Sequence, residues 1–152
     1  MDRGNKTPHG YARAVSAQPV GVSARLVTVE ADLTRGLHSF TIIGLPDKAM
    51  EESKDRLSAA IRHAGFESPK SSNKRIVLSL SPADLKKEGS HYDLPLALAY
   101  LVAAGETKPL PADALFSGEL ALDGALRAVR GVLPQVMCAK ENGIREVFVP
   151  PG

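Results

Sequence analysis

Residues 75–105 read RIVLSLSPADLKKEGSHYDLPLALAYLVAAG, and this stretch decides the fold class. Its first part, Ile76–Leu80, alternates apolar and polar side chains, which predicts a half-buried strand. A polar loop follows over residues 81–91. The apolar run from Asp93 to Ala104, closed by Gly105, then predicts a helix. Because helices follow strands here and further along the chain, the sequence favours an α/β or α+β domain.

The chain after this stretch continues the same pattern. A hairpin is predicted from Leu115–Leu122 and Ala125–Val129, because Asp123-Gly124 between them is a strong turn dipeptide. A helix over Leu133–Asn142 and a last strand over Glu146–Val149 follow. The second half therefore mixes strands with helices.

The chain before this stretch begins with strands. Apolar and polar residues alternate over Ala24–Leu33, and shorter apolar runs at Ala12–Ala17 and Phe40–Ile43 read as two more strands. Their short connections predict an antiparallel meander. A helix should begin at Asp47, whose side chain can cap it, and should stop before Gly65.

Length and composition limit the class of protein. The chain has 152 residues, 43% of them hydrophobic and 24% charged, which suits one globular domain and excludes wholesale disorder. We expect residues 1–10 to form a flexible polar tail and residues 11–152 a single domain. No apolar run approaches the ~20 residues of a membrane span, and the lone Cys138 excludes an internal disulfide. A cytoplasmic protein is the default expectation.

The sequence contains no clear metal or nucleotide site. Its four histidines are scattered, at His9, His38, His63 and His91, without the paired spacing of zinc enzymes. His91 and Asp93 lie near Glu88, but capping of the following helix is the favoured role for Asp93. The only partial match to a phosphate-binding loop, residues 4–7, lacks the first glycine and the preceding strand. We therefore expect no metal and no bound nucleotide.

Five basic residues flank the predicted strand at Ile76–Leu80. If the loops before and after this strand reach one side, they form a small cationic patch able to hold phosphates. The alternative is ordinary solvated surface charge. The patch predicts weak, sequence-independent DNA binding, since no aromatic side chain lies among the five to stack on bases. The residues are Lys70, Lys74, Arg75, Lys86 and Lys87.

Three long runs, Phe40–Ile61, Arg75–Gly105 and Leu115–Pro150, resemble the N-terminal domain of the ComM (YifB) family. Members are bacterial AAA+ ATPases related to magnesium chelatase, and the resemblance covers residues 11–150. It implies the ribosomal protein S5 domain 2-like fold, a mixed sheet with helices packed on one face. The proteolytic domain of Lon shares this fold.

The resemblance also locates two degenerate peptidase positions. Lon-type enzymes carry a serine in a Lys-Asp-Gly-Pro-Ser-Ala-Gly loop and a lysine on a later helix. Here Gly89 matches the glycine of that loop, His91 falls at the serine and Leu133 at the lysine. Ser90 could be the nucleophile only if the loop shifts by one residue, and leucine cannot act as its base. The resemblance therefore implies a peptidase fold without its chemistry.

The family's activity implies a role for the chain. Its members are hexameric helicases that promote DNA branch migration during natural transformation, and ATP and Mg²⁺ belong to an AAA+ module C-terminal to this domain. The expected function is thus a non-catalytic domain that helps assembly or contacts DNA, with no cofactor of its own. A Lon-like Ser/Lys peptidase and a magnesium-chelatase-type accessory subunit remain as alternatives.

Overall fold

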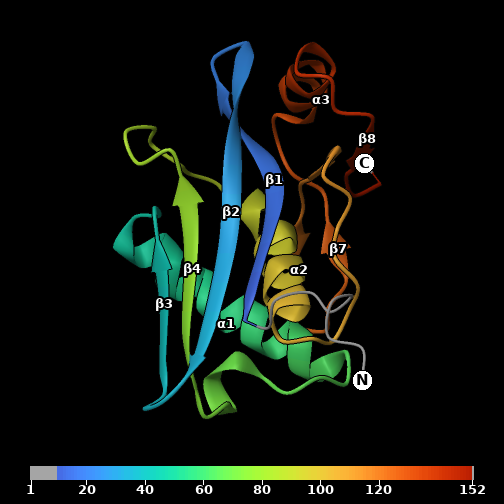
Figure 1. Cartoon of the computed structure of the whole chain (residues 1–152). Helices are drawn as coiled ribbons and strands as arrows, with labels where there is room; N and C mark the ends of the chain where they lie inside the picture. The colour runs from blue at the N-terminus through green and yellow to red at the C-terminus, as the bar shows by residue number, and fades with distance from the viewer. Residues whose placement is uncertain (1–9, 152) are drawn as a thin grey trace, which may run out of the picture.

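A six-stranded mixed sheet organises residues 10–151, the part of the chain that the computed structural model describes. The strand order is β3-β4-β2-β1-β5-β8, and a separate small hairpin is formed by β6 and β7 (Figure 1). The strands are β1 (Tyr11–Val20), β2 (Ser23–Arg35), β3 (Ser39–Ile43), β4 (Lys74–Ser81), β5 (Ala114–Phe116), β6 (Glu119–Leu120), β7 (Leu126–Arg127) and β8 (Glu146–Phe148). The helices are α1 (Asp47–His63), α2 (Asp93–Ala103) and α3 (Val132–Glu141), with short 3-10 turns at Pro69–Ser71 and Ser90–Tyr92. The predicted α/β class with a mixed sheet is confirmed.

The first two strands form a long antiparallel hairpin. Their register runs without interruption from the pair Tyr11–Asp32 to the pair Val20–Ser23. The turn is made by Gly21 and Val22, and Gly21 has the positive φ, +62°, that suits glycine. The two strands of this long hairpin are the central strands of the six-stranded sheet.

The predicted antiparallel meander is wrong at its third strand. β3 pairs with β4 in parallel, and β4 lies between β3 and β2, antiparallel to β2. The reason is the connection through α1, because two parallel neighbours need a crossover of this length. Local alternation identified each strand but could not show that a later strand inserts between two earlier ones.

Two helices cover one face of the sheet and the third packs against the other. Residues Val27, Val29 and Ala31 of β2 enter the main core, where α1 and α2 pack. The alternate residues Ala24 and Leu26 instead join a second cluster with Cys138 and Ala139 of α3. Since neighbouring residues of a strand point to opposite faces, α3 lies across the sheet from the other two helices. The expectation that all helices share one face is therefore wrong for α3.

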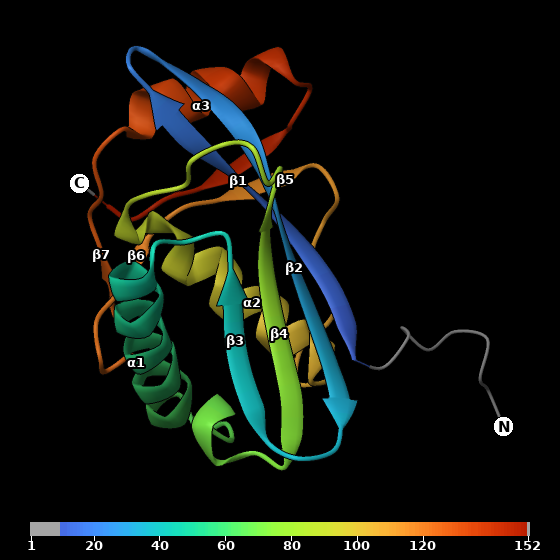
Figure 2. The same ribbon diagram turned by 90° about the vertical axis from the view of Figure 1, so that its left-hand side faces the viewer.

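Figure 2 shows the same arrangement from the side. α1 and α2 lie beside the body of the sheet, whereas α3 lies under the tip of the β1–β2 hairpin. On the α3 side, the part of the sheet formed by β3, β4 and the far end of β2 carries partly or fully exposed residues, among them Thr41 and Asp32. This uncovered area reaches the β3 edge.

The ends of the elements differ in detail from the prediction. α1 begins at Asp47, but Pro46 occupies the capping position and no side chain caps the helix. Gly10 belongs to the domain and not to a tail, since its N–H donates to the Ala103 carbonyl at 3.1 Å and its carbonyl accepts from Leu33. The rest of the predicted tail, residues 1–9, lies outside the described residues. Within the described residues no helix is long and apolar enough to cross a membrane.

Candidate functional site

A hollow of about 680 Å³ opens between the loop before α2 and the segment before α3. One wall is Glu88–His91, the other is Ala128–Gly131, and Glu119 of β6 completes it. Gln18 and Pro19 of β1 form the floor. The hollow is thus lined by the loop that resembles the Lon serine loop and by three segments that lie far from this loop in the sequence.

Gln18 holds the loop in place from within the sheet. Its Oε1 accepts hydrogen bonds from the Tyr92 hydroxyl at 2.6 Å and from the Glu88 amide at 2.9 Å. Tyr92 is fully buried, and this burial raises the pKa of its phenol, so the hydroxyl remains a donor. Sequence reasoning missed Gln18, which lies just beyond the predicted strand Ala12–Ala17; nothing local distinguishes it from the other polar residues of β1, Arg13 and Ser16.

His91 fixes the loop at a second point. Its Nε2 lies 2.8 Å from the Ala17 carbonyl, and burial lowers the pKa of the imidazole, so the neutral ring donates this bond. Gly89 makes the geometry possible, because its φ is +104° and a Cβ there would lie 2.9 Å from His91 Nδ1. His91, which the resemblance aligns with the Lon serine, therefore acts as a structural anchor.

Ser90 faces the hollow but lacks a lysine partner. Its hydroxyl donates to the carboxylate of Glu119, and no lysine is among the residues that line the hollow. Leu133, the counterpart of the Lon lysine, lies in the first turn of α3 with 68% of its surface exposed and does not line the hollow. This arrangement offers no Ser–Lys dyad.

Asp93 does not cap α2, contrary to the prediction. Its carboxylate is completely buried and binds Arg56 of α1, with Nε at 2.6 Å from Oδ2 and Nη2 at 3.1 Å from Oδ1. The Ser53 hydroxyl and the Leu120 amide also donate to it. The hydrogen bond with Asp93 raises the pKa of the Arg56 guanidinium. One buried ion pair thus joins α1, α2 and the β6–β7 hairpin beside the hollow.

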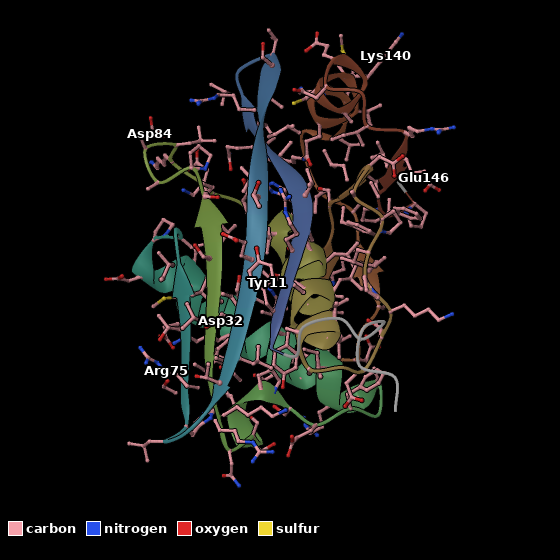
Figure 3. The ribbon with its side chains drawn as sticks, in the orientation of Figure 1. Tyr11, Asp32, Arg75, Asp84, Lys140 and Glu146 are labelled. Carbon is pink, nitrogen blue, oxygen red and sulfur yellow. The ribbon has the colours of Figure 1, made fainter. Side chains whose placement is uncertain are left out.

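The five basic residues of the predicted DNA patch do not lie together. Lys74 and Arg75 begin β4 and Lys70 lies in the 3-10 turn before it, whereas Lys86 and Lys87 lie beyond the end of the strand. Six strand residues, Ile76–Ser81, separate the two groups, roughly 20 Å of backbone. In Figure 3, the labelled Arg75 and Asp84 mark these opposite ends. The two loops lie at opposite ends of β4, so the premise that both reach one side of the molecule is not met.

Burial and pairing separate these five residues further. Lys87 is only 2% exposed; its Nζ donates to the Pro82 carbonyl at 2.6 Å, and burial lowers the pKa of its ammonium group. Lys70 forms an ion pair with Asp55, and the Nζ of Lys86 lies 3.9 Å from the Oε1 of Glu88. Lys74 and Arg75 have no ion-pair partner within residues 10–151.

Arg35 joins Lys74 and Arg75 and was missed by sequence reasoning. The antiparallel register places Arg35 directly opposite Lys74, and Thr34 opposite Arg75. Arg35 and Lys74 also line a hollow of about 350 Å³ beside the end of α2. We name Arg35, Lys74 and Arg75 the cationic end of the sheet. Only the strand pairing, which the sequence did not reveal, brings Arg35 there.

Other candidate chemistry has a structural explanation. No group of three or more potential metal ligands from His, Cys, Asp and Glu occurs within residues 10–151. Cys138 is buried against the sheet, and this burial raises the pKa of its thiol, which disfavours the reactive thiolate. Residues 4–7, the partial phosphate-loop match, lie outside the described part of the chain.

These features define an α/β domain built on a mixed sheet. The family model described as subunit ChlI of Mg-chelatase matches residues 29–152, most of the chain. The chain belongs to this ChlI family.

Named relatives agree with this assignment. Competence protein ComM of Haemophilus influenzae is 43% identical in an alignment of 143 residues that covers 91% of this chain and 26% of that protein. YifB of Escherichia coli is 41% identical over 131 residues, 86% of this chain and 25% of YifB. The peroxisomal Lon protease homolog 2 of Caenorhabditis elegans is 29% identical over 147 residues, 94% of this chain and 18% of that protein. The chain thus spans about a quarter of the length of ComM and YifB, and the predicted family resemblance is confirmed.

Proposed function

We propose that this chain acts as the non-catalytic N-terminal domain of a ComM-like, magnesium-chelatase-related AAA+ motor in the cytoplasm. The motor would promote DNA branch migration during natural transformation, and the domain would help its hexameric assembly or contact DNA. ATP and Mg²⁺ would bind an AAA+ module outside these 152 residues. The similarity to ComM and YifB over most of the chain supports this proposal.

The Ser90–Glu119 contact is the observation that carries the non-catalytic role. A serine becomes a nucleophile when a neighbouring base takes its proton, and a desolvated lysine serves this purpose in a Ser–Lys dyad. Here the Ser90 hydroxyl faces a carboxylate at the edge of an open hollow, and the lysine position holds the exposed Leu133. The likeness to a Lon homologue favours a peptidase as the second candidate.

Hydrolysis of an unfolded, fluorogenic casein distinguishes the two candidates. We expect no turnover by the wild-type chain and none by Ser90→Ala, measured over hours at micromolar protein. Steady hydrolysis that Ser90→Ala abolishes would contradict the non-catalytic role and establish a peptidase.

The cationic end is our proposed DNA contact. Arg35 and Lys74 are like charges directly opposite on paired strands, which is unfavourable unless an anion lies between them. A DNA phosphate would supply that anion without any base contact. With about three contacts the affinity of one domain should be near the weak end of ~10⁻⁴–10⁻⁶ M at physiological salt. In a ring, several such contacts would act together and bind firmly.

Fluorescence anisotropy with a labelled duplex tests this contact. We expect Lys74→Ala/Arg75→Ala to weaken binding and Lys86→Ala, at the other end of β4, to leave it unchanged. Equal loss in both variants would mean that diffuse surface charge, and not this end of the sheet, binds the DNA.

A further inference from the structure

The hollow between residues 88–91 and 128–131 has a wall whose peptide groups are unpaired. The pairing of β7 with β6 ends at the pair Arg127–Glu119. Beyond this pair, residues 128–130 form no backbone hydrogen bond within the described part of the chain, and neither does the N–H of Gly89 on the opposite wall. Both walls therefore carry free peptide groups beside a hollow of about 680 Å³. A second peptide backbone is the ligand that pairs with such groups in series.

The walls of this hollow are fixed in place without a ligand. On one side, Gln18 Oε1 accepts the Glu88 amide at 2.9 Å, and His91 Nε2 bonds a carbonyl of β1 at 2.8 Å. On the other side, Gly131 packs so closely on the floor that a Cβ there would lie 2.7 Å from the Cγ of Pro19. Because little of the protein has to become ordered on binding, the hollow is suited to hold a flexible partner.

Glu119 is the charged group of the hollow that is best placed to bind a ligand. Its carboxylate accepts a hydrogen bond from Ser90 and forms no ion pair within residues 10–151. The neighbouring Arg56 is engaged by Asp93 and Glu52 instead. Since a carboxylate forms its strongest hydrogen bonds with cations, the ligand that fits this position carries a lysine or arginine side chain.

The charges of the hollow also exclude a phosphate ligand. Glu88 and Glu119 oppose the single guanidinium of Arg130, and the buried His91 is neutral. Glu88 is countered only by the exposed Lys86 at 3.9 Å, an ion pair of little strength in water. A hollow of net negative charge repels the backbone of DNA and attracts a basic peptide. Its ligand is thus of a different kind from that of the cationic end.

We propose that this hollow binds an extended polypeptide segment that carries a lysine or arginine. The backbone of the segment pairs with residues 128–130, and its basic side chain binds Glu119. The inference goes beyond the proposed function and does not depend on it, since it involves neither DNA nor an AAA+ module. A single short strand in an open hollow binds weakly, with an expected dissociation constant of roughly 10–1,000 µM.

Fluorescence anisotropy of the whole chain with two labelled heptapeptides, AVTKTVA and AVTETVA, tests the ligand class. We expect saturable binding of the lysine peptide and about tenfold weaker binding of the glutamate peptide. Glu119→Gln, which keeps an acceptor for Ser90, should weaken binding of the lysine peptide about tenfold and should not weaken that of the glutamate peptide. Glu141→Gln is the matched control, because it removes an exposed carboxylate of α3 that does not line the hollow.

Val129→Pro tests the backbone pairing, because it removes one N–H of the wall without altering a charge. It should abolish saturable binding and leave the urea unfolding curve unchanged, since Val129 forms no backbone hydrogen bond with the described residues. Hydrogen–deuterium exchange of the wild type provides a readout without a variant. Amides of residues 128–130 should exchange more slowly with the lysine peptide present, while those of β3 should not change.

Four results would each overturn the inference. They are equal affinity for the two peptides or no saturable binding up to about 1 mM, equal loss in Glu119→Gln and Glu141→Gln, unchanged exchange of residues 128–130, and displacement of the lysine peptide by an unlabelled DNA duplex. The last result would assign the hollow to DNA.

Discussion

Replacing Arg56 by methionine should destabilise the domain much more than a change on an exposed helix normally does. The substitution keeps the length of the side chain but removes the charge that binds Asp93. Arg56 is 22% exposed, whereas the Asp93 side chain is fully buried. After the change, Asp93 keeps only the Ser53 hydroxyl and the Leu120 amide as donors. A carboxylate without its counter-charge in the interior is strongly unfavourable.

The expected cost follows from this burial. Breaking a buried pair by removing one partner costs about 3–5 kcal/mol, and water that reaches the partly exposed Arg56 position favours the lower limit, about 3 kcal/mol. For a domain of this size that is a decrease in Tm of roughly 6–12 °C. Urea unfolding followed by circular dichroism gives the free energy of unfolding directly.

A matched control and a double variant separate this ion pair from general helix effects. Lys70→Met removes the surface partner of Asp55 and should cost less than ~1 kcal/mol. Arg56→Met/Asp93→Leu should be more stable than the sum of the two single changes predicts, because no unpaired charge remains. If Arg56→Met costs no more than Lys70→Met, Asp93 does not depend on this partner and the reasoning fails.

Three further outcomes follow from the structure. Burial lowers the pKa of His91, so the unfolded chain binds a proton at this residue more readily than the folded domain does. The free energy of unfolding should therefore fall as pH drops below about 6.5. His91→Gln should reduce that slope in urea titrations, and an unchanged slope would contradict this reading of His91. Calorimetry with ATP and Mg²⁺ should give no heat of binding, since the sequence holds no complete phosphate-binding loop, and micromolar affinity would contradict this. Cys138 should react with a thiol reagent only as the domain unfolds, so labelling of the native protein at the rate of a free thiol would show that α3 is not packed as described.

Local patterns in the sequence were sufficient to locate most elements. Period-two alternation identified β2 and β4, and the strand over Ala24–Leu33 lies within the observed Ser23–Arg35. The helix predicted over Leu133–Asn142 is α3, displaced by one residue. These elements could be located because each buries one face, and a buried face places apolar residues at regular intervals along the sequence.

The pairing of strands that are far apart in the sequence could not be predicted from such local patterns. Alternation shows that a strand has a buried face but not which strand lies beside it, so the insertion of β4 between β2 and β3 was missed. For the same reason Arg35 was not connected with Lys74. Lys87 and Asp93 were misread because charged residues in loops are normally exposed or capping, whereas here tertiary contacts bury both.

The salt dependence of DNA binding tests the proposed role of the domain most directly. In anisotropy titrations from low to moderate salt, each phosphate contact adds roughly 0.9 to the slope of log affinity against log salt. The wild type should bind weakly, and Arg35→Ala/Lys74→Ala/Arg75→Ala should both weaken binding and lower the slope by about 2–3. A Lys86→Ala control should keep the wild-type slope. Coincident curves for the wild type and the triple variant would contradict a DNA contact at the cationic end.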